Sequence, residues 1–600
     1  MCNLDRLQEH LRAMNWHGFV LPSTDEYLSE FAQPFGRRLE WVTGFSGSTG
    51  LAVVLQDRAA LFLDGRYRLQ GEKETAGLSI EVLDASEIVR NRWLAANLRG
   101  GHRLAIDTRL QSYPDVERTL RFAAERGIKV IELSQNPIDE LWGSKRPALP
   151  SSAVVDYPTH FAGAPATQKC AELREWLVEN GIDCHLIADP EDVAWLLNVR
   201  TSDSLNARSN GSHIVPVPLS RVLVEATGEV CWFVESTRLE PALRTRLQST
   251  VKVIDPALFE SFLEELGSGR VVGADLQRTP HKFAAIAARV GAIRNDAVVA
   301  RRRWRKHPTE IERAREGHYL DGQAVIRFLA WLQRTIPERT VTEIEASGKL
   351  TEFRAELPGY KGISMPLMSA SGPSGALPHY VPSKGSNRRL NDHPIYWMDS
   401  GGHYYGCSTD NTVCIAVGKP ETRHVLAHTL VVKGFIALAL ARFPTGISST
   451  QLDSFARKYL WQEGMDYKHG TGHGVGNFMN IHEGPNIRPG IDHPRVAPIE
   501  VGMIISNEPA YYSDGDFGVR VESHLVTVQS KYEGFLEFET LSRLPIDPRL
   551  IDEALLTSKE KRWLADYHTG ISEGYTGCFD EETARWLREI VDSYVAMTRR

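Results

Sequence analysis

Three histidines and five glycines lie within residues 469–485, HGTGHGVGNFMNIHEGP. The first four glycines alternate strictly, whereas a dinucleotide fingerprint needs G-x-G-x-x-G and a phosphate loop needs a following Gly-Lys pair. His469 and His473 have the i, i+4 spacing of a helical zinc motif, but the glycines around them would cost a helix roughly 1 kcal/mol each. We therefore expect a loop that brings imidazole close to a bulky or charged group, with an ordinary glycine-rich turn as the alternative.

Four carboxylates stand at the margins of strand-like apolar runs. Asp399 follows IYWM, Asp410 precedes TVCIAV, and Glu508 follows VGMIISN. Glu522 falls inside the predicted strand GVRVESHLVTV, where the period of two places it on the same face as Arg520. A carboxylate at the end of a buried strand is costly unless it meets a cation or hydrogen-bond donors.

Together these four carboxylates and one imidazole are consistent with a cage for two metal ions. Four carboxylates carry a charge of −4, which two divalent cations balance. Oxygen-rich ligation with a single histidine favours Mn²⁺, with Co²⁺ or Zn²⁺ as alternatives, over a thiolate zinc site. Each residue alone has a simpler interpretation, as a turn aspartate, a solvent-facing glutamate or a turn histidine, and only their combination favours the cage.

The 600 residues are too many for one core, so several domains must position this group. Helix, strand and helix signals over 166–200 parallel those over 7–31, which predicts two similar α/β domains in tandem. A Pro/Ser/Gly-rich stretch at 145–166 marks a linker. We expect domains at 1–155, 156–303 and 304–600. The last opens on a helix from 307, for which Thr309 and Glu312 predict a capping box, and it ends in helices.

Composition excludes some classes of function. A net charge of −7 argues against nucleic-acid binding, and we interpret the basic run 300–308 as a solvated charge cluster. The first residues lack an apolar core like that of a signal peptide, and no run reaches the eighteen apolar residues of a membrane span. Seven scattered cysteines without a CxxC pair indicate reduced thiols in a cytoplasmic protein.

The order of these motifs resembles a known family. Asp399, Asp410 eleven residues later, His473 in G-x-G-H-G-x-G, then glutamates in SNEP and GVRVE resemble the metallopeptidases that include methionine aminopeptidase, prolidase and Xaa-Pro aminopeptidase. Further segments, among them SGPSGALPHY at 371–380 and FLDGRY at 62–67, resemble the long, three-domain Xaa-Pro aminopeptidase subgroup. The resemblance implies an α/β (α+β) architecture of two creatinase-like domains followed by a pita-bread catalytic domain.

The resemblance also implies roles for individual residues. Asp410 and Glu522 would bridge two metal ions, and His379 would lie over the scissile bond. His482 would stabilise the tetrahedral intermediate or pass a proton, while His469 and Arg520 would act on the substrate side or behind the ligands. The full set of implied metal ligands is Asp399, Asp410, His473, Glu508 and Glu522.

The implied reaction is hydrolysis of the bond before a proline in the second position of a peptide. Two cations lower the pKa of a shared water toward neutrality, hydroxide attacks the carbonyl, and Glu508 carries the proton to the prolyl nitrogen. A homodimer is also implied. Departures from the family pattern at Pro378, Val413, Cys414 and Ser523 leave two alternatives open: a relative that hydrolyses a non-peptide amide, and a non-catalytic binding protein.

Overall fold

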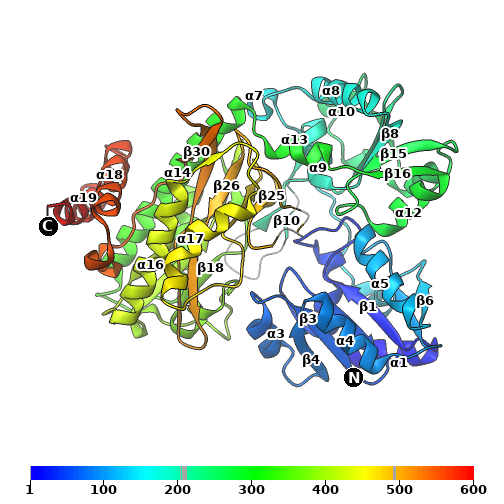
Figure 1. Cartoon of the computed structure of the whole chain (residues 1–600), viewed down its shortest axis with the longest axis horizontal. Coiled ribbons are helices and arrows are strands. Elements are labelled where there is room, and N and C mark those ends of the chain that lie inside the picture. The colour runs from blue at the N-terminus through cyan, green and yellow to red at the C-terminus, as the bar shows by residue number, and fades with distance from the viewer. Residues whose placement is uncertain (1, 203, 206–212, 491–492, 494, 600) are drawn as a thin grey trace. The chain divides into compact units, whose positions relative to one another are not determined.

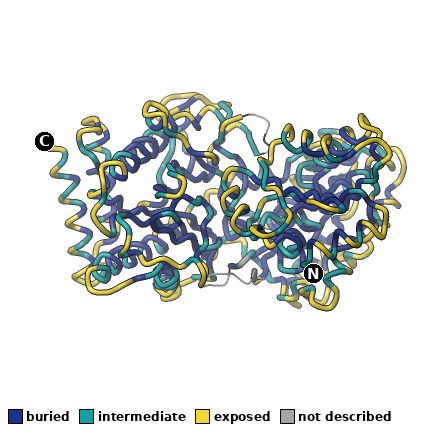
Figure 2. Tube along the Cα trace, turned by 90° about the horizontal axis from the view of Figure 1, so that it is seen from below, coloured by how far each residue is buried: buried dark blue, intermediate teal, exposed yellow. Residues whose placement is uncertain are grey.

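The computed structural model describes residues 2–202, 204–205, 213–490, 493 and 495–599. The chain divides into two compact units, which are treated separately below. Unit 1 comprises 1–159, 164–205 and 217–300, and unit 2 comprises 160–163, 206–216 and 301–600. Among the described residues, no helix is both long and apolar enough to cross a membrane. In Figure 2 the buried residues, in dark blue, lie mainly in the interior and the exposed residues, in yellow, mainly on the outer turns of the chain.

Unit 1 contains two six-stranded sheets. The first has the order β4-β3-β2-β1-β5-β6. Its strands are β1 (Gly18–Pro22), β2 (Leu51–Leu55), β3 (Ala59–Leu63), β4 (Ile80–Asp84), β5 (Arg103–Ile106) and β6 (Lys129–Glu132). The second has the order β14-β13-β12-β8-β15-β16. Its strands are β8 (Cys184–Ile187), β12 (Arg221–Glu225), β13 (Val230–Phe233), β14 (Lys252–Ile254), β15 (Arg270–Ala274) and β16 (Gly291–Asn295).

The two sheets share one topology. In each, the first strand pairs antiparallel with the second and parallel with the fifth. The remaining pairs also match: the second and third strands are antiparallel, and the outer pairs are parallel. The predicted tandem repeat of α/β folds is therefore confirmed.

Amphipathic helices cover these sheets. In α1 (Asn3–Ala13), Leu4, Leu7 and Leu11 recur at helical spacing and are buried in the core of the first sheet. The other long helices of unit 1 are α4 (Glu87–Asn97), α5 (Tyr113–Glu125), α8 (Ala166–Glu179), α9 (Pro190–Leu197) and α12 (His281–Val290).

Unit 2 is built on a mostly antiparallel sheet of order β23-β30-β29-β26-β24-β25 and a smaller one of order β18-β19-β22. The first has β23 (Arg442–Pro444), β24 (Gly472–Val475), β25 (His482–Ile487), β26 (Ile504–Asn507), β29 (Ser523–Gln529) and β30 (Phe535–Thr540). The second has β18 (Met368–Ser371), β19 (Ile395–Ser400) and β22 (Asn411–Ala416), and β27 (Ala510–Ser513) pairs separately with β28 (Phe517–Arg520).

Helices flank the strands of unit 2. Figure 1 shows α16 (Thr422–Ala439) and α17 (Thr450–Gln462) in front of the strands that include β18 and β26. The remaining long helices are α14 (Pro308–Thr335), α15 (Glu343–Ala355), α18 (Ser558–Gly574) and α19 (Glu581–Met597). The two C-terminal helices confirm the predicted helical tail.

The predicted capping box of Thr309 and Glu312 is wrong. The N-cap of α14 is His307, whose Nδ1 accepts from the Thr309 backbone N–H at 3.1 Å, while the backbone N–H of His307 donates to Glu310 Oε2 at 2.9 Å. Pro308 occupies the first helical position, where its missing N–H costs nothing. The helix therefore starts before Thr309, and both predicted residues lie inside it.

Candidate metal centre

Two aspartates lie at the same end of the β19–β22 strand pair. These strands run antiparallel, with Asp399 opposite Thr412 and Ser400 opposite Asn411. Asp399 belongs to β19, and Asp410 directly precedes β22. Both aspartates are buried, as is the apolar remainder of the two strands. The sequence pattern of an apolar run ending in a carboxylate is confirmed for this pair.

His473 lies on a short strand, and not in the loop expected from its glycines. Strand β24 passes between β25 and β26. A Cβ atom at Gly472 would lie 2.0 Å from the Ser506 carbonyl oxygen, and one at Gly474 would lie 2.0 Å from the Gly484 carbonyl oxygen. These two glycines therefore admit neighbouring backbone on both sides, which a side chain would block.

Glu508 and Glu522 approach from two further segments. Glu508 directly follows β26, and its backbone N–H donates to the Thr471 carbonyl oxygen at 2.8 Å. Glu522 was expected inside a strand, but it falls in a break between β28 and β29. The chain changes sheets at this point, and the Glu522 backbone N–H donates to the Thr412 carbonyl oxygen at 3.0 Å. The strand prediction for Glu522 is therefore wrong, although its proximity to Arg520 is retained.

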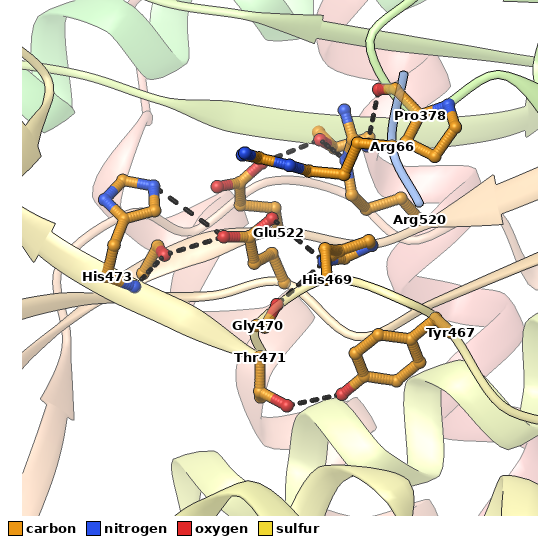
Figure 3. A network of polar contacts seen from close by, with 12 residues as sticks. Arg66, Pro378, Tyr467, His469, Gly470, Thr471, His473, Arg520 and Glu522 are labelled. Atoms are coloured by element: carbon orange, nitrogen blue, oxygen red, sulfur yellow. Dashed lines mark hydrogen bonds and ion pairs between the residues drawn. The ribbon is translucent and has the colours of Figure 1, made fainter. Parts of the chain in front are cut away.

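The predicted residues meet in three overlapping groups, in each of which one ligand atom per residue lies within 4.8 Å of the others. The groups are Asp399, Asp410 and Glu522; His473, Glu508 and Glu522; and Asp410, His473 and His482. Glu522, Asp410 and His473 each belong to two groups, and of these only the two carboxylates have a second oxygen that could contact a second ion. Figure 3 shows His473, His469 and Arg520 gathered around Glu522.

The electrostatics of this group favour bound cations. Burial raises the pKa of Asp399 to about 7, and the neighbouring Asp410 adds to the shift despite the opposing Arg520. Burial also raises the pKa of Glu522 well above its usual value, reinforced by Asp410 and Asp399. Asp399 Oδ1 and Asp410 Oδ1 are buried and lack a hydrogen-bond partner in the described part of the chain. Buried like charges with open oxygens are costly alone, so the residues present fit two divalent ions.

The carboxylates that destabilise one another's charged forms stabilise the charged form of His473. Its Nε2 lies 3.6 Å from Asp410 Oδ2 and 3.7 Å from Glu508 Oε1. Burial lowers the pKa of this imidazole, but Asp410 and Glu508 outweigh that effect and raise it to about 9. The imidazole that could bind a metal therefore carries a proton while the carboxylates lack a cation, and a metal ion would have to displace that proton.

Arg520 holds several parts of the site together. It is buried, forms an ion pair with Asp399, and donates from Nη1 to the Tyr512 hydroxyl at 2.7 Å and to the Pro378 carbonyl oxygen at 3.1 Å. Its Nε donates to Thr412 Oγ1 at 2.9 Å, and that hydroxyl donates to Glu522 Oε2 at 2.7 Å. Arg520 thus contacts Asp399 directly and Glu522 through Thr412.

Tyr512 and Thr412 were not predicted as site residues. Tyr512 lies four residues after Glu508 of the SNEP motif and Thr412 lies in the run after Asp410, but their roles depend on partners on other segments of the fold. The Tyr512 hydroxyl joins Arg520 to His469, whose Nε2 lies 3.1 Å from it. Nδ1 of His469 lies 3.8 Å from Glu508 Oε2, so the structure brings this predicted residue to the cluster.

Residues of helix α17 hydrogen-bond the glycine-rich segment through Arg457 and Asp453. Arg457 was not predicted from the sequence. Arg457 is buried, pairs with Asp453 at 2.6 Å, and donates from Nη2 to the His469 carbonyl oxygen at 2.6 Å. Asp453 in turn accepts from Thr471 Oγ1 at 2.7 Å. The i, i+4 spacing of Asp453 and Arg457 is the only sequence signal, and it resembles an ordinary helix-surface pair.

The two remaining predicted histidines lie on different elements. His482 begins β25, and its ring stands nearly perpendicular to that of His473, with centroids 4.5 Å apart. His379 is half-buried in a turn, directly after the Pro378 carbonyl that accepts from Arg520. The structure therefore ties the backbone beside His379 to the same arginine that pairs with Asp399.

The departures from the family pattern are packing positions. Val413 is buried in a core cluster with Tyr396 and Met398. Cys414 is 3% exposed and lies opposite Trp397, and burial raises the pKa of its thiol far above the usual value. Ser523 is also buried. None of these changes removes a member of the three ligand groups.

Family models match nearly the whole chain. The creatinase/prolidase N-terminal domain matches residues 3–134 and, in a second form, 145–310. Metallopeptidase family M24 matches residues 312–529, followed by the C-terminal region of peptidase M24 at 534–593. The chain belongs to metallopeptidase family M24, with two creatinase-type domains ahead of a pita-bread domain, and it is a hydrolase.

Individual members of the family are similar to this chain over almost its full length. A probable Xaa-Pro aminopeptidase P of Laccaria bicolor is 33% identical, over 98% of this chain and 92% of its own. A probable Xaa-Pro aminopeptidase P of Pyricularia oryzae is 32% identical, over 98% of this chain and 99% of its own. Among solved structures, the X-prolyl aminopeptidase of Caenorhabditis elegans, a cytosolic enzyme with a di-nuclear active site, has a TM-score of 0.90 at 29% identity, covering 96% of this chain and 95% of that one.

Proposed function

We propose that this protein is an Xaa-Pro aminopeptidase, which removes the first residue of a peptide whose second residue is proline. The observation that carries the proposal is the convergence of six titratable side chains into three overlapping ligand groups. Full-length similarity to proteins named Xaa-Pro aminopeptidase P supports it. Domain limits of 1–155, 156–303 and 304–600 remain part of the proposal.

Five of those side chains are the proposed metal ligands: Asp399, Asp410, His473, Glu508 and Glu522. Asp410 and Glu522 would contact both ions, because each belongs to two of the groups and, unlike His473, offers two carboxylate oxygens. Carboxylate oxygens dominate the donor set, which favours Mn²⁺ over softer ions, with Co²⁺ or Zn²⁺ as substitutes. The −4 charge of the carboxylates matches two divalent cations.

Bound ions would supply Lewis-acid chemistry, lowering the pKa of a water from 15.7 toward neutrality and polarising the scissile carbonyl. The remaining steps fall to the protein. Glu508, whose Oε1 accepts from Ser506 Oγ at 3.3 Å, takes the proton of the attacking water and delivers it to the prolyl nitrogen. His379 and His482 donate hydrogen bonds to the charge that develops on the carbonyl oxygen.

The proposed preference for proline concerns the nitrogen of the scissile bond, which belongs to the proline ring. Its nitrogen has no hydrogen, so a site that grips an amide N–H fits it poorly. His469 is a proposed substrate-side group, whereas Arg520 is proposed to act from behind the ligands, where it also holds the backbone of Pro378. We propose peptides with proline second as substrates and a homodimer, as the resemblance implies. The negative net charge supports the absence of a nucleic-acid partner, and the scattered cysteines support a cytoplasmic location.

A peptide panel tests the function. Purified protein, stripped with EDTA and reloaded with Mn²⁺, is incubated with matched tripeptides that carry proline or alanine at position two. We expect release of the first residue from the proline peptides only, and only after reloading. Equal cleavage of both series would contradict proline specificity, and equal rates before and after reloading would contradict the metal requirement.

A further inference from the structure

A buried ion pair lies behind the two aspartates, on the opposite side of their strands. Successive side chains of a strand point to opposite faces, so Ser400 and Asn411 point away from the aspartates that precede them. These two residues are directly opposite each other in the β19–β22 register. Whatever holds Ser400 and Asn411 therefore fixes both strand ends at the point where the aspartates project.

The ion pair is formed by Arg354 of α15 and Asp321 of α14. Arg354 Nε donates to Asp321 Oδ1 at 2.7 Å and Nη2 donates to Oδ2 at 3.0 Å, a two-point contact between fully buried groups. The same Nη2 reaches Ser400 through its carbonyl oxygen at 3.3 Å and its Oγ at 3.1 Å.

Asp321 completes the connection to the second strand. Its Oδ2 accepts from Asn411 Nδ2 at 3.4 Å, and its Oδ1 accepts from the Tyr404 hydroxyl at 3.0 Å. Asn411 is also held from its other side, because its Oδ1 accepts from Ser542 Oγ. The Arg354–Asp321 pair is therefore hydrogen-bonded to both Ser400, which follows Asp399, and Asn411, which follows Asp410.

We propose that the Arg354–Asp321 pair positions Asp399 and Asp410 relative to each other and thereby sets the affinity of the site for its two cations. The inference rests on the proposed function, since it takes both aspartates as metal ligands. Arg354 and Asp321 are positioning residues that act through Ser400 and Asn411. A buried ion pair by itself is weak evidence for stability, because desolvation offsets much of the attraction. The rigid fork of Arg354, in contrast, fixes direction as well as distance.

A purely structural role would give a different result. In that case the pair would support the packing of α14 and α15, and its loss would lower stability without altering metal affinity in the folded molecule. Lys433 and Glu560 provide a matched control in the same unit. They form a buried pair at 2.7 Å between α16 and α18, and Lys433 also donates to the Leu555 carbonyl oxygen at 2.8 Å.

The test compares Mn²⁺ binding and stability in the full chain. Arg354→Lys keeps the charge but cannot contact both carboxylate oxygens and Ser400 together. Calorimetric titration of EDTA-stripped protein, well below its melting temperature, should show Mn²⁺ affinity reduced by about 10-fold. This is the lower end of the scale for residues that hydrogen-bond a metal ligand directly, because Arg354 acts only through Ser400 and Asp321. Lys433→Met should lower the melting temperature of the metal-free protein while its Mn²⁺ affinity stays at the wild-type value.

A lower melting temperature with wild-type affinity in Arg354→Lys would overturn the proposal. If Arg354→Lys does not fold, Asn411→Ala gives the test, because it leaves the ion pair intact and removes its link to β22. Ser542→Ala, which removes only the other side-chain hydrogen bond of Asn411, is the control. Asn411→Ala should also weaken Mn²⁺ binding, by several-fold, and unchanged affinity would again overturn the proposal. A wild-type chain that binds no Mn²⁺ would instead refute the proposed function, so the two failures are distinguishable.

Discussion

The two faces of the β19–β22 strand pair carry buried carboxylates that are balanced in different ways. On the site face, Asp399 and Asp410 lie beside Glu522, and each aspartate has one buried oxygen without a hydrogen-bond partner among the described residues. On the back face, Asp321 accepts from Arg354, Tyr404 and Asn411. Both oxygens of Asp321 on the back face are paired within the chain, although Arg354 Nη1 is buried without a partner among the described residues. The site face, in contrast, concentrates negative charge that Arg520 and His473 balance only in part.

Removing a site-face carboxylate should break this contrast most severely. Asp410→Asn keeps the shape but removes a charge that two ions would share. We expect loss of both metal ions and a fall in hydrolysis of about 10³-fold or more, because each ion contributes several kcal/mol to transition-state stabilisation. Elemental analysis and the peptide assay measure the two effects, with Asp392→Asn, at an exposed carboxylate, as the control. Two full equivalents of metal in Asp410→Asn would contradict a shared ligand.

Substitution of His379 should affect catalysis without affecting the binding of metal ions. His379→Ala should keep both metal ions and the fold but lose about 10²–10³-fold in kcat, the scale for one transition-state donor. The loss should appear in kcat more than in KM. Metal content, melting temperature and kcat are measured on one preparation. Normal kcat with a lowered melting temperature would make His379 a structural residue.

Removing the metal ions should lower the free energy of unfolding, because the buried carboxylates of the site face then lack their cations. A cation that binds only the folded chain stabilises it by about 2.7 kcal/mol at 100 times its Kd. We expect Mn²⁺ to raise the free energy of unfolding of the wild-type protein by this order, measured by urea unfolding with and without EDTA. In Asp410→Asn the increment should vanish. An equal increment in that variant would place the stabilising ions elsewhere.

The stability of the metal-free protein should depend on pH through a buried histidine outside the site. His568 on α18 is fully buried, and burial lowers its pKa to about 4, below the 6.5 of an unfolded histidine. Between these values the unfolded chain binds a proton that the folded chain does not, so stability falls as pH falls and levels off below about 4. His568→Gln should reduce this loss by about 1.4 kcal/mol per pH unit over that range. An unchanged slope of urea midpoint against pH would show that His568 is protonated in the folded state.

Cys414 should produce the smallest effect. It is buried opposite Trp397 with a thiol whose pKa is raised far above normal, so it is neither a thiolate nucleophile nor a soft ligand. Cys414→Ala should change kcat by less than about threefold, because packing and not transition-state stabilisation is altered. Loss of most activity with metal and fold intact would contradict this interpretation.

Local sequence patterns predicted the elements that meet in the site but not how they are braced. Apolar runs ending in Asp399, Asp410 and Glu508 predicted strand-end carboxylates correctly, since burial and alternation are local properties. Glu522 was placed inside a strand because the pattern GVRVESHLV is continuous in sequence. The break there arises from pairing with two different sheets, which only the tertiary structure determines.

Glycine spacing misled in a similar way. Alternating glycines argued for a loop at His473, but Gly472 and Gly474 are required by the close approach of neighbouring strands. The bracing residues Thr412, Arg457 and Tyr512 gave no usable signal, because each acts through a partner on another segment of the fold. The candidate ligands could be proposed because they stand in motifs of fixed spacing, whereas the residues that support them depend on contacts that spacing does not encode.

Anomalous diffraction from crystals of the Mn²⁺-loaded protein tests the central claim most directly. The account predicts two manganese peaks per chain, both in contact with carboxylate oxygens of Asp410 and Glu522, with Asp399 and His473 each bound to one of them. A single peak, or two peaks that do not share Asp410 and Glu522, would contradict the two-ion site on which the proposed function depends.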